Sequence, residues 1–145
     1  MPELTKSSLP LPYGTPLTLA LAKRLMGAAE QEANAHGWPM VIAIVDSNGH
    51  LLMLQRMDQA QHGSIGLAQK KAETALNFRR STRIFQELLA AGGDGLRVLS
   101  MDGVVAVEGG ELLVVDGKII GAIGVSGMRP EQDTQVALAA CHVVS

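Results

Sequence analysis

The stretch PMVIAIVDSNGHLLMLQRMD restricts the fold more than any other, because it holds two apolar runs joined by an Asn-Gly pair. Asn48-Gly49 tolerates positive φ and predicts a two-residue type I′ hairpin turn. Every residue from Val41 to Val45 is apolar, whereas a strand with one solvated face alternates apolar and polar residues. We therefore expect this strand to be covered on both faces, with helices on both sides of its sheet.

Apolar spacing and capping residues predict four helices around this hairpin. The first runs from Thr15 to Gly37, with a proline in its first turn. Ser64 can cap the second, Ser81 or Thr82 can cap a shorter third, and the last runs from Pro130 to about Val143. The buried faces of the second and third helices are expected to hold Ile65, Ala68, Ala72, Ala75, Leu76, Phe85, Leu88 and Leu89.

The last third of the chain, GVVAVEGGELLVVDGKIIGAIGV, predicts three short strands. Gly109-Gly110 separates the first two, and Asp116-Gly117 is a second hairpin turn. Gly121 and Gly124 weaken the last strand unless a helix, a neighbouring subunit or a ligand approaches its backbone closely. The element order indicates an α/β (α+β) fold, with an antiparallel sheet of about five strands between helical layers.

One domain accounts for the whole chain apart from its start. Residues 1–14 contain several prolines and are expected to form a leader with little regular structure, followed by a single domain over residues 15–145. The start lacks the pattern of a signal peptide, and no window reaches about 18 apolar residues. One cysteine, Cys141, rules out an intramolecular disulfide and fits a reducing compartment. The predicted location is the cytoplasm.

Charge and motif spacing exclude several classes of function. A net charge of -2 leaves no basic excess for nucleic acid. No His or Cys spacing is typical of zinc, and no acidic loop is typical of calcium. Gly124-Val125-Ser126-Gly127-Met128 resembles the hydrolase motif G-x-S-x-G but carries Met128 in place of the last glycine. Ser126 is therefore expected to lie in a turn or line a pocket rather than act as a nucleophile.

The residues with the best placement for binding lie around the second predicted strand and the loop after it. Arg56 and Asp58 flank Met57, so they can form an ion pair or hold a ligand carboxylate. His62 lies in a polar loop, where functional side chains are common. Lys71 is expected to snorkel over apolar surface, or alternatively to reach an acid group. Of the other histidines, His36 and His142 are expected to be structural, and His50, after the Asn48-Gly49 turn, is expected to be exposed.

Separated motifs in this order resemble one known family: GxPMVIAIVDxxGxLLxxxRMDxA, KAxTAxxFRRST, GGxL and GAIGVSGxxxxQDxxVAxAA, over roughly Leu17 to Cys141. They resemble the GlcG/HbpS family, which includes the C-terminal domain of PduO-type corrinoid adenosyltransferases. The resemblance implies a profilin-like three-layer α/β/α fold, homo-oligomers and, in several relatives, haem binding. Gln59 and Met128 stand where the family usually has glycine, so both add side chains to any pocket there.

The resemblance, together with His62 and the Arg56/Asp58 pair, implies a homo-oligomeric accessory protein that binds a small ligand, with haem or a related tetrapyrrole as the expected cofactor. No nucleic acid or membrane partner is expected. Two alternatives stay open. One is an enzyme acting on a small organic acid, with Arg56 holding the carboxylate and His62 or Asp133 moving protons. The other is an accessory subunit for corrinoid-dependent metabolism. The predicted ligand-binding residues are Arg56, Asp58, His62, Lys71, Ser126, Met128 and Asp133.

Overall fold

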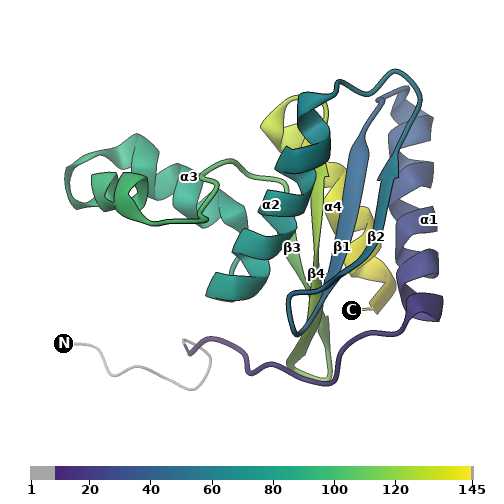
Figure 1. The fold of residues 1–145 in the computed structure, drawn as a ribbon, viewed down its shortest axis with the longest axis horizontal. Helices are drawn as coiled ribbons and strands as arrows, with labels where there is room; N and C mark the ends of the chain where they lie inside the picture. Colours follow the sequence, from purple (N-terminus) through teal and green to yellow (C-terminus); the bar gives the residue numbers. More distant parts are fainter. Residues whose placement is uncertain (1–8, 145) are drawn as a thin grey trace.

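The computed structural model describes residues 9–144 and has an α+β fold around one antiparallel sheet (Figure 1). The sheet has four strands: β1 (Val41–Asp46), β2 (Leu51–Arg56), β3 (Gly110–Val115) and β4 (Lys118–Ser126). Their order is β2-β1-β4-β3, so the apolar strand β1 and the long strand β4 lie in the middle.

Helices cover both faces of this sheet. α1 (Leu19–His36) and α4 (Pro130–Val144) pack on one face, and α2 (Gly63–Phe78) packs on the other (Figure 1). α3 (Thr82–Ala91) and the 3₁₀ helix η2 (Gly93–Ser100) follow α2 and extend to one side of the sheet. Helical layers on both faces agree with the prediction, whereas the profilin-like classification stays a prediction.

Strand β1 explains why both faces must be covered. Val41, Ala43 and Val45 belong to the apolar clusters on the α2 side, and Ile42 and Ile44 belong to the cluster with α1 and α4. All five side chains have 0% exposed surface. Successive side chains of a strand point to opposite faces of the sheet. The unbroken apolar run of β1 therefore supplies side chains to two separate cores, as predicted.

Glycines let α2 lie directly on the sheet. A Cβ added at Gly124 would overlap Ala68 O and lie 2.6 Å from Ala72 N, both in the α2 backbone. A Cβ at Gly110 would overlap Lys71 O of the same helix. Of the three explanations that the sequence allowed for the glycine in β4, a closely packed helix is the one observed at Gly124.

The prediction of about five strands is wrong by one. The segment before Gly109 was expected to form a strand, but its backbone groups bond to helix side chains. Val105 N donates to Thr74 Oγ1 at 3.2 Å, and Glu108 N donates to Gln86 Oε1 at 2.9 Å. Because α2 and α3 supply these partners, the segment forms a loop against the helices and adds no strand to the sheet.

The first helix begins later than predicted, at Leu19 with Thr18 as its cap rather than at Thr15. The preceding segment runs along β4 instead, where Leu17 N donates to Ile120 O at 3.1 Å. Tyr13 forms an isolated parallel bridge with Ile119. Of the predicted leader, residues 1–8 lie outside the described part of the chain. The helix ends at Gly37 with φ 69°, as expected.

The two hairpin turns differ from each other. Asp116 and Gly117 have φ values of 51° and 74°, as a type I′ turn requires. At Asn48-Gly49 only the glycine has positive φ, so the predicted type I′ turn is wrong there. The Asp46 carboxylate is the physical reason, because it accepts hydrogen bonds from Asn48 N and His50 N and closes a longer loop.

Across residues 9–144, none of the helices combines the length and the apolar character needed to cross a membrane.

Candidate functional site

The strand register gathers most of the predicted binding residues at one end of the sheet. Val41 pairs with Arg56 on one side and with Ser126 on the other. The start of β1 and the ends of β2 and β4 therefore lie in one row, at the upper end of the view in Figure 1. We call this region the loop end; its three loops are residues 37–40, 57–62 and 127–129.

Two adjoining cavities form an open groove at the loop end, which we call the Met57 groove. The larger has a volume of about 380 Å³ and is lined by Glu30, Asn34, Gln55, Arg56, Met57 and Asp58. The smaller has a volume of about 280 Å³ and is lined by Asn34, Gly37, Trp38, Pro39, Met57, Asp58 and Gln59. Both volumes suit at least part of a small ligand. Arg56, Met57 and Asp58, which follow one another in the chain, all line the larger cavity, and their role in ligand binding stays a prediction.

The groove combines flat apolar surface with an available cation. The Trp38 ring stacks on His36 with ring centroids 4.2 Å apart, and Met57 lies half-buried beside it. In the described range, the exposed side chains of Arg56 and Asp58 form no ion pair with each other or with any other residue. A guanidinium without a partner can form paired hydrogen bonds with a ligand carboxylate.

Gln59 has an unusual backbone in the wall of the smaller cavity. Its φ is 69°, in the left-handed region that disfavours residues with a Cβ by about 1–2 kcal/mol. This is one of the two positions where the sequence resemblance led us to expect glycine. The glutamine side chain therefore enters the groove lining at the cost of local strain.

His62 lies at the start of α2 but does not line the groove. It occupies the N-cap position, its side chain makes no cap hydrogen bond, and it is exposed. The prediction that Ser64 caps this helix is therefore wrong, because Ser64 lies inside the first turn and is fully buried. Ile65, expected on the buried face, is 38% exposed. Ser64, four residues before Ala68, lies on the buried face of the helix, and Ile65 beside it points toward solvent.

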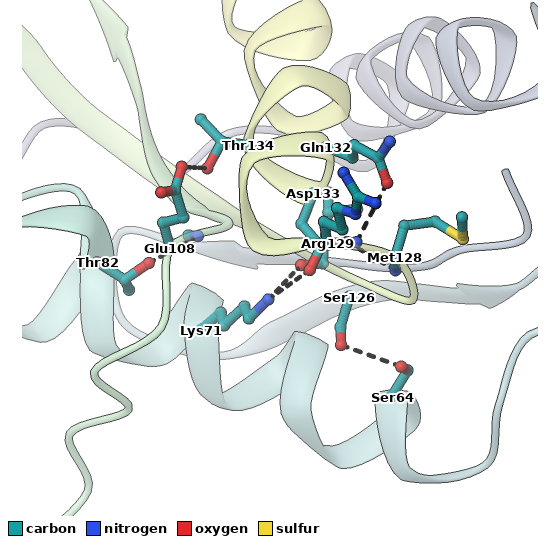
Figure 2. A network of polar contacts seen from close by, with 12 residues as sticks. Ser64, Lys71, Thr82, Glu108, Ser126, Met128, Arg129, Gln132, Asp133 and Thr134 are labelled. Atoms are coloured by element: carbon teal, nitrogen blue, oxygen red, sulfur yellow. Dashed lines mark hydrogen bonds and ion pairs between the residues drawn. The ribbon is translucent and has the colours of Figure 1, made fainter. Parts of the chain in front are cut away.

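Ser126 is a structural contact between the sheet and α2. Its side chain is 2% exposed, and its hydroxyl donates to Ser64 Oγ at 3.0 Å (Figure 2). Gln61 Nε2 also donates to Ser64 Oγ, at 3.0 Å. Met128, two residues further on, is 40% exposed and lies on the surface of the loop end. Neither Ser126 nor Met128 lines the Met57 groove.

Lys71 is the largest departure from the sequence prediction. It does not snorkel: its side chain has 0% exposed surface, and Nζ lies 2.9 Å from Asp133 Oδ2 and 2.9 Å from Val125 O (Figure 2). The carboxylate of Asp133 is also buried, at the first turn of α4. Burial lowers the pKa of Lys71 and raises the pKa of Asp133, in each case against the attraction of the partner charge.

Gly109, Glu108 and Thr134 lie around this pair, and none of them was predicted to bind a ligand. A Cβ at Gly109 would lie 2.8 Å from Lys71 Nζ, so only glycine leaves room for the ammonium group. Thr134 Oγ1 donates to Glu108 Oε1 at 2.7 Å beside it (Figure 2). The Gly109-Gly110 pair was noted only as a break between strands. Another cavity, of about 430 Å³, is lined by Glu108 and Thr134 but by none of the predicted ligand residues.

Residues 9–144 contain no group of three or more His, Cys, Asp or Glu side chains placed to hold a metal ion. Cys141 donates its thiol hydrogen to Leu112 O at 3.4 Å. Burial, followed by the nearby Glu111, raises the pKa of this thiol to about 12, so it stays protonated.

The sheet between two helical layers and the groove at its loop end define a small α+β domain. The chain belongs to the HbpS-like family, because the family model described as "Haem degrading protein HbpS-like" matches residues 17–142.

Three similar proteins illustrate this family. GlcG of Escherichia coli K12 is 39% identical over 110 residues, which are 76% of this chain and 81% of that protein. The corrinoid adenosyltransferase PduO of Salmonella typhimurium is 33% identical over 135 residues, 90% of this chain but only 40% of PduO. A structure described as a PduOC:haem complex has a TM-score of 0.81 and 32% identity, and the match covers 90% of this chain and 96% of that one.

Proposed function

We propose that this protein binds haem or a related tetrapyrrole in the Met57 groove, as a homo-oligomeric accessory protein of the cytoplasm. One observation supports the site above all others: the unpaired guanidinium of Arg56 lines the same groove as the apolar side chains of Trp38 and Met57. A tetrapyrrole with acidic side groups has the same combination of a flat apolar ring and carboxylates. A relative with 32% identity has been solved as a haem complex.

The residues of the groove suit distinct parts of such a ligand. Arg56 would hold a propionate through charge-assisted hydrogen bonds. The Trp38 ring and the Met57 side chain would contact the apolar face of the macrocycle. Met57 Sδ, in the groove, would be an iron ligand, and the exposed imidazole of His62, which lies at the loop end outside the groove lining, is the alternative. When bound, the iron of the haem would supply its own redox and ligand-binding chemistry.

A haemin titration of the purified protein, followed by absorbance, tests this proposal. We expect saturation at a fixed ratio per subunit, and affinity about tenfold to a hundredfold lower for Arg56→Gln, because a charge-assisted hydrogen bond is lost. Arg97→Gln is the matched control, since Arg97 is exposed on η2 and outside the groove. Uptake without saturation, or equal affinity for both variants, would reject the proposed site.

Axial ligation needs a separate comparison. Met57→Leu keeps the size and apolar character of the side chain but removes the sulfur, and His62→Ala removes the imidazole. We expect one of these variants to shift the Soret band of bound haemin while the other leaves it unchanged. Unchanged spectra for both would show that neither residue ligates the iron.

A small organic acid is the second candidate ligand, favoured by the polar lining of the larger cavity around Arg56. Of the proton-transfer groups considered for an enzyme, Asp133 is buried against Lys71 and does not line the groove. Calorimetric titration with succinate tests this alternative directly. A saturable heat of succinate binding that disappears in Arg56→Gln would favour the acid. If haemin does not displace succinate, the two ligands bind at different sites.

An accessory role in corrinoid metabolism is the third possibility, since the chain matches part of PduO. Co-purification with a corrinoid adenosyltransferase would support it. Recovery of the protein as a homo-oligomer without that enzyme would count against it.

A further inference from the structure

The buried ion pair joins the two helical layers at the loop end. Lys71 extends from α2, and Asp133 lies in the first turn of α4, on the opposite face of the sheet (Figure 2). The side chain of the lysine passes Gly109, whose missing Cβ leaves the necessary space. The two charged groups meet beside the residue that precedes β3. They therefore lie at the edge of the sheet, where no β3 residue separates the two helical layers.

This pair holds both sides of one turn. Lys71 Nζ donates to Val125 O, just before the turn, and Met128 N donates to Asp133 Oδ1 at 3.1 Å, just after its glycine. The turn at Gly127 also touches the groove wall. A Cβ at Gly127 would lie 2.5 Å from Pro39 O, and Pro39 lines the smaller cavity with Trp38.

The energetic cost of the pair argues for a specific role. Two buried charges lose their hydration, and a well-packed apolar pair of similar size is often equally stable or more stable. Capping the turn alone would need only the carboxylate, which can accept from Met128 N without a buried lysine. The lysine adds a link from the turn to α2 that an ordinary helix cap would not provide.

We infer that Lys71 and Asp133 are positioning residues for the Met57 groove: their ion pair fixes the turn at residues 126–129 against Pro39 and thereby sets the place of Trp38. The inference extends the proposed function, because the groove it shapes is the proposed ligand site. The ion pair should order the groove wall even when no ligand is bound, so this effect can be measured in the free protein.

The test replaces both charges at once, so that neither is left buried and unpaired. Lys71→Met with Asp133→Leu keeps apolar bulk at both positions but removes the acceptor of Met128 N and the donor to Val125 O. We expect a folded protein whose Met128 amide exchanges with solvent at least about tenfold faster, because that hydrogen bond is gone. Trp38, the only tryptophan, should become more accessible to acrylamide quenching.

Two further variants separate positioning from general stability. Lys71→Met with Asp133→Asn restores an acceptor for Met128 N and should return its exchange toward the wild-type rate. If the leucine variant does not fold, this variant serves as the test variant. Its Trp38 should then be more accessible to acrylamide than in the wild type, but less accessible than in an unfolded chain. Asp46→Asn is the matched control, because Asp46 is another buried carboxylate that caps a turn, at the opposite end of β1. It should lower stability and leave both readouts unchanged.

The positioning role of the ion pair and the binding of haem are tested by different results. Unchanged Met128 exchange and unchanged Trp38 quenching in a folded variant without the ion pair would overturn the inference. Equal changes in the Asp46→Asn control would overturn it as well, since they would reflect stability alone. The expected haemin result is an affinity about tenfold lower without the pair. A wild-type protein that takes up haemin without saturation would reject the proposed function, while the exchange and quenching results would still decide on positioning.

Discussion

Replacing Gly124 by alanine tests the contact that brings α2 onto the sheet and places Lys71 beside Asp133. The new Cβ would lie 2.6 Å from Ala72 N, whereas ordinary contact begins at 3.4 Å, so the helix must move by about 0.8 Å at that atom alone. It would also overlap Ala68 O. Both neighbours are backbone atoms, so no side-chain rotation can relieve the overlap.

The expected cost follows from the rigidity of these neighbours. Overpacking in a core typically costs about 1–3 kcal/mol when side chains can adjust. Because α2 must shift as a unit, we expect Gly124→Ala to lower the free energy of unfolding by about 3 kcal/mol or more. Urea unfolding followed by circular dichroism measures this loss as a lower midpoint.

A glycine-to-alanine substitution in α2 itself is the control. Gly66 lies in α2, is exposed and has nothing within 4 Å of an added Cβ. Gly66→Ala should therefore raise the free energy of unfolding by about 0.5–1 kcal/mol, because alanine favours the helix. A Gly124→Ala variant as stable as the wild type would refute the close packing of α2 on β4.

Three further predictions concern single side chains. Gln59→Gly should raise the free energy of unfolding by up to about 1 kcal/mol, because it relieves a φ of 69° at some cost in chain entropy; a lower melting temperature would contradict this. Burial raises the pKa of Glu111 above its ordinary 4.5, so its contribution to stability falls as pH rises from 4.5 through the raised pKa. The stability of Glu111→Gln relative to wild type should therefore increase over that pH range, and a constant difference in thermal melts would refute it. With a pKa of about 12 against an ordinary 9.0, the Cys141 thiol should be roughly a thousandfold less ionised than usual at about pH 8; a thiol-reactive dye that labels folded and unfolded protein equally fast would contradict this.

Local sequence signals predicted the elements but not their exact partners. The apolar run of β1, the Ser81 cap of α3 and the Asp116-Gly117 turn each depend on residues close together in the chain, and each was predicted correctly. The Asn48-Gly49 turn failed because the side chain of Asp46 reorganises it. The segment before Gly109 failed because its partners are side chains of α2 and α3.

The candidate site depended on contacts that no local pattern contains. Lys71 looked like a surface residue because its burial requires Asp133, 62 residues away, and the space left by Gly109. Arg56 and Asp58 form no ion pair with each other, and their role in ligand binding stays a prediction; only the register of β2, β1 and β4 brings this end of β2 to the same end of the sheet as the Trp38 loop. The sequence could not show that the loops at residues 37–40, 57–62 and 127–129 lie next to one another, because this depends on the pairing of strands far apart in the chain.

The most direct test of the proposed function is the ¹H–¹⁵N spectrum of the labelled protein during a haemin titration, because the paramagnetic iron broadens the signals of nearby amides. We predict that the amides of Trp38, residues 57–59 and residues 127–128 broaden first and saturate at a fixed haemin ratio. The amides of residues 47–50, in the turn at the opposite end of β1, should stay sharp. Broadening that is uniform over the protein, or centred on residues 47–50, would contradict binding at the Met57 groove.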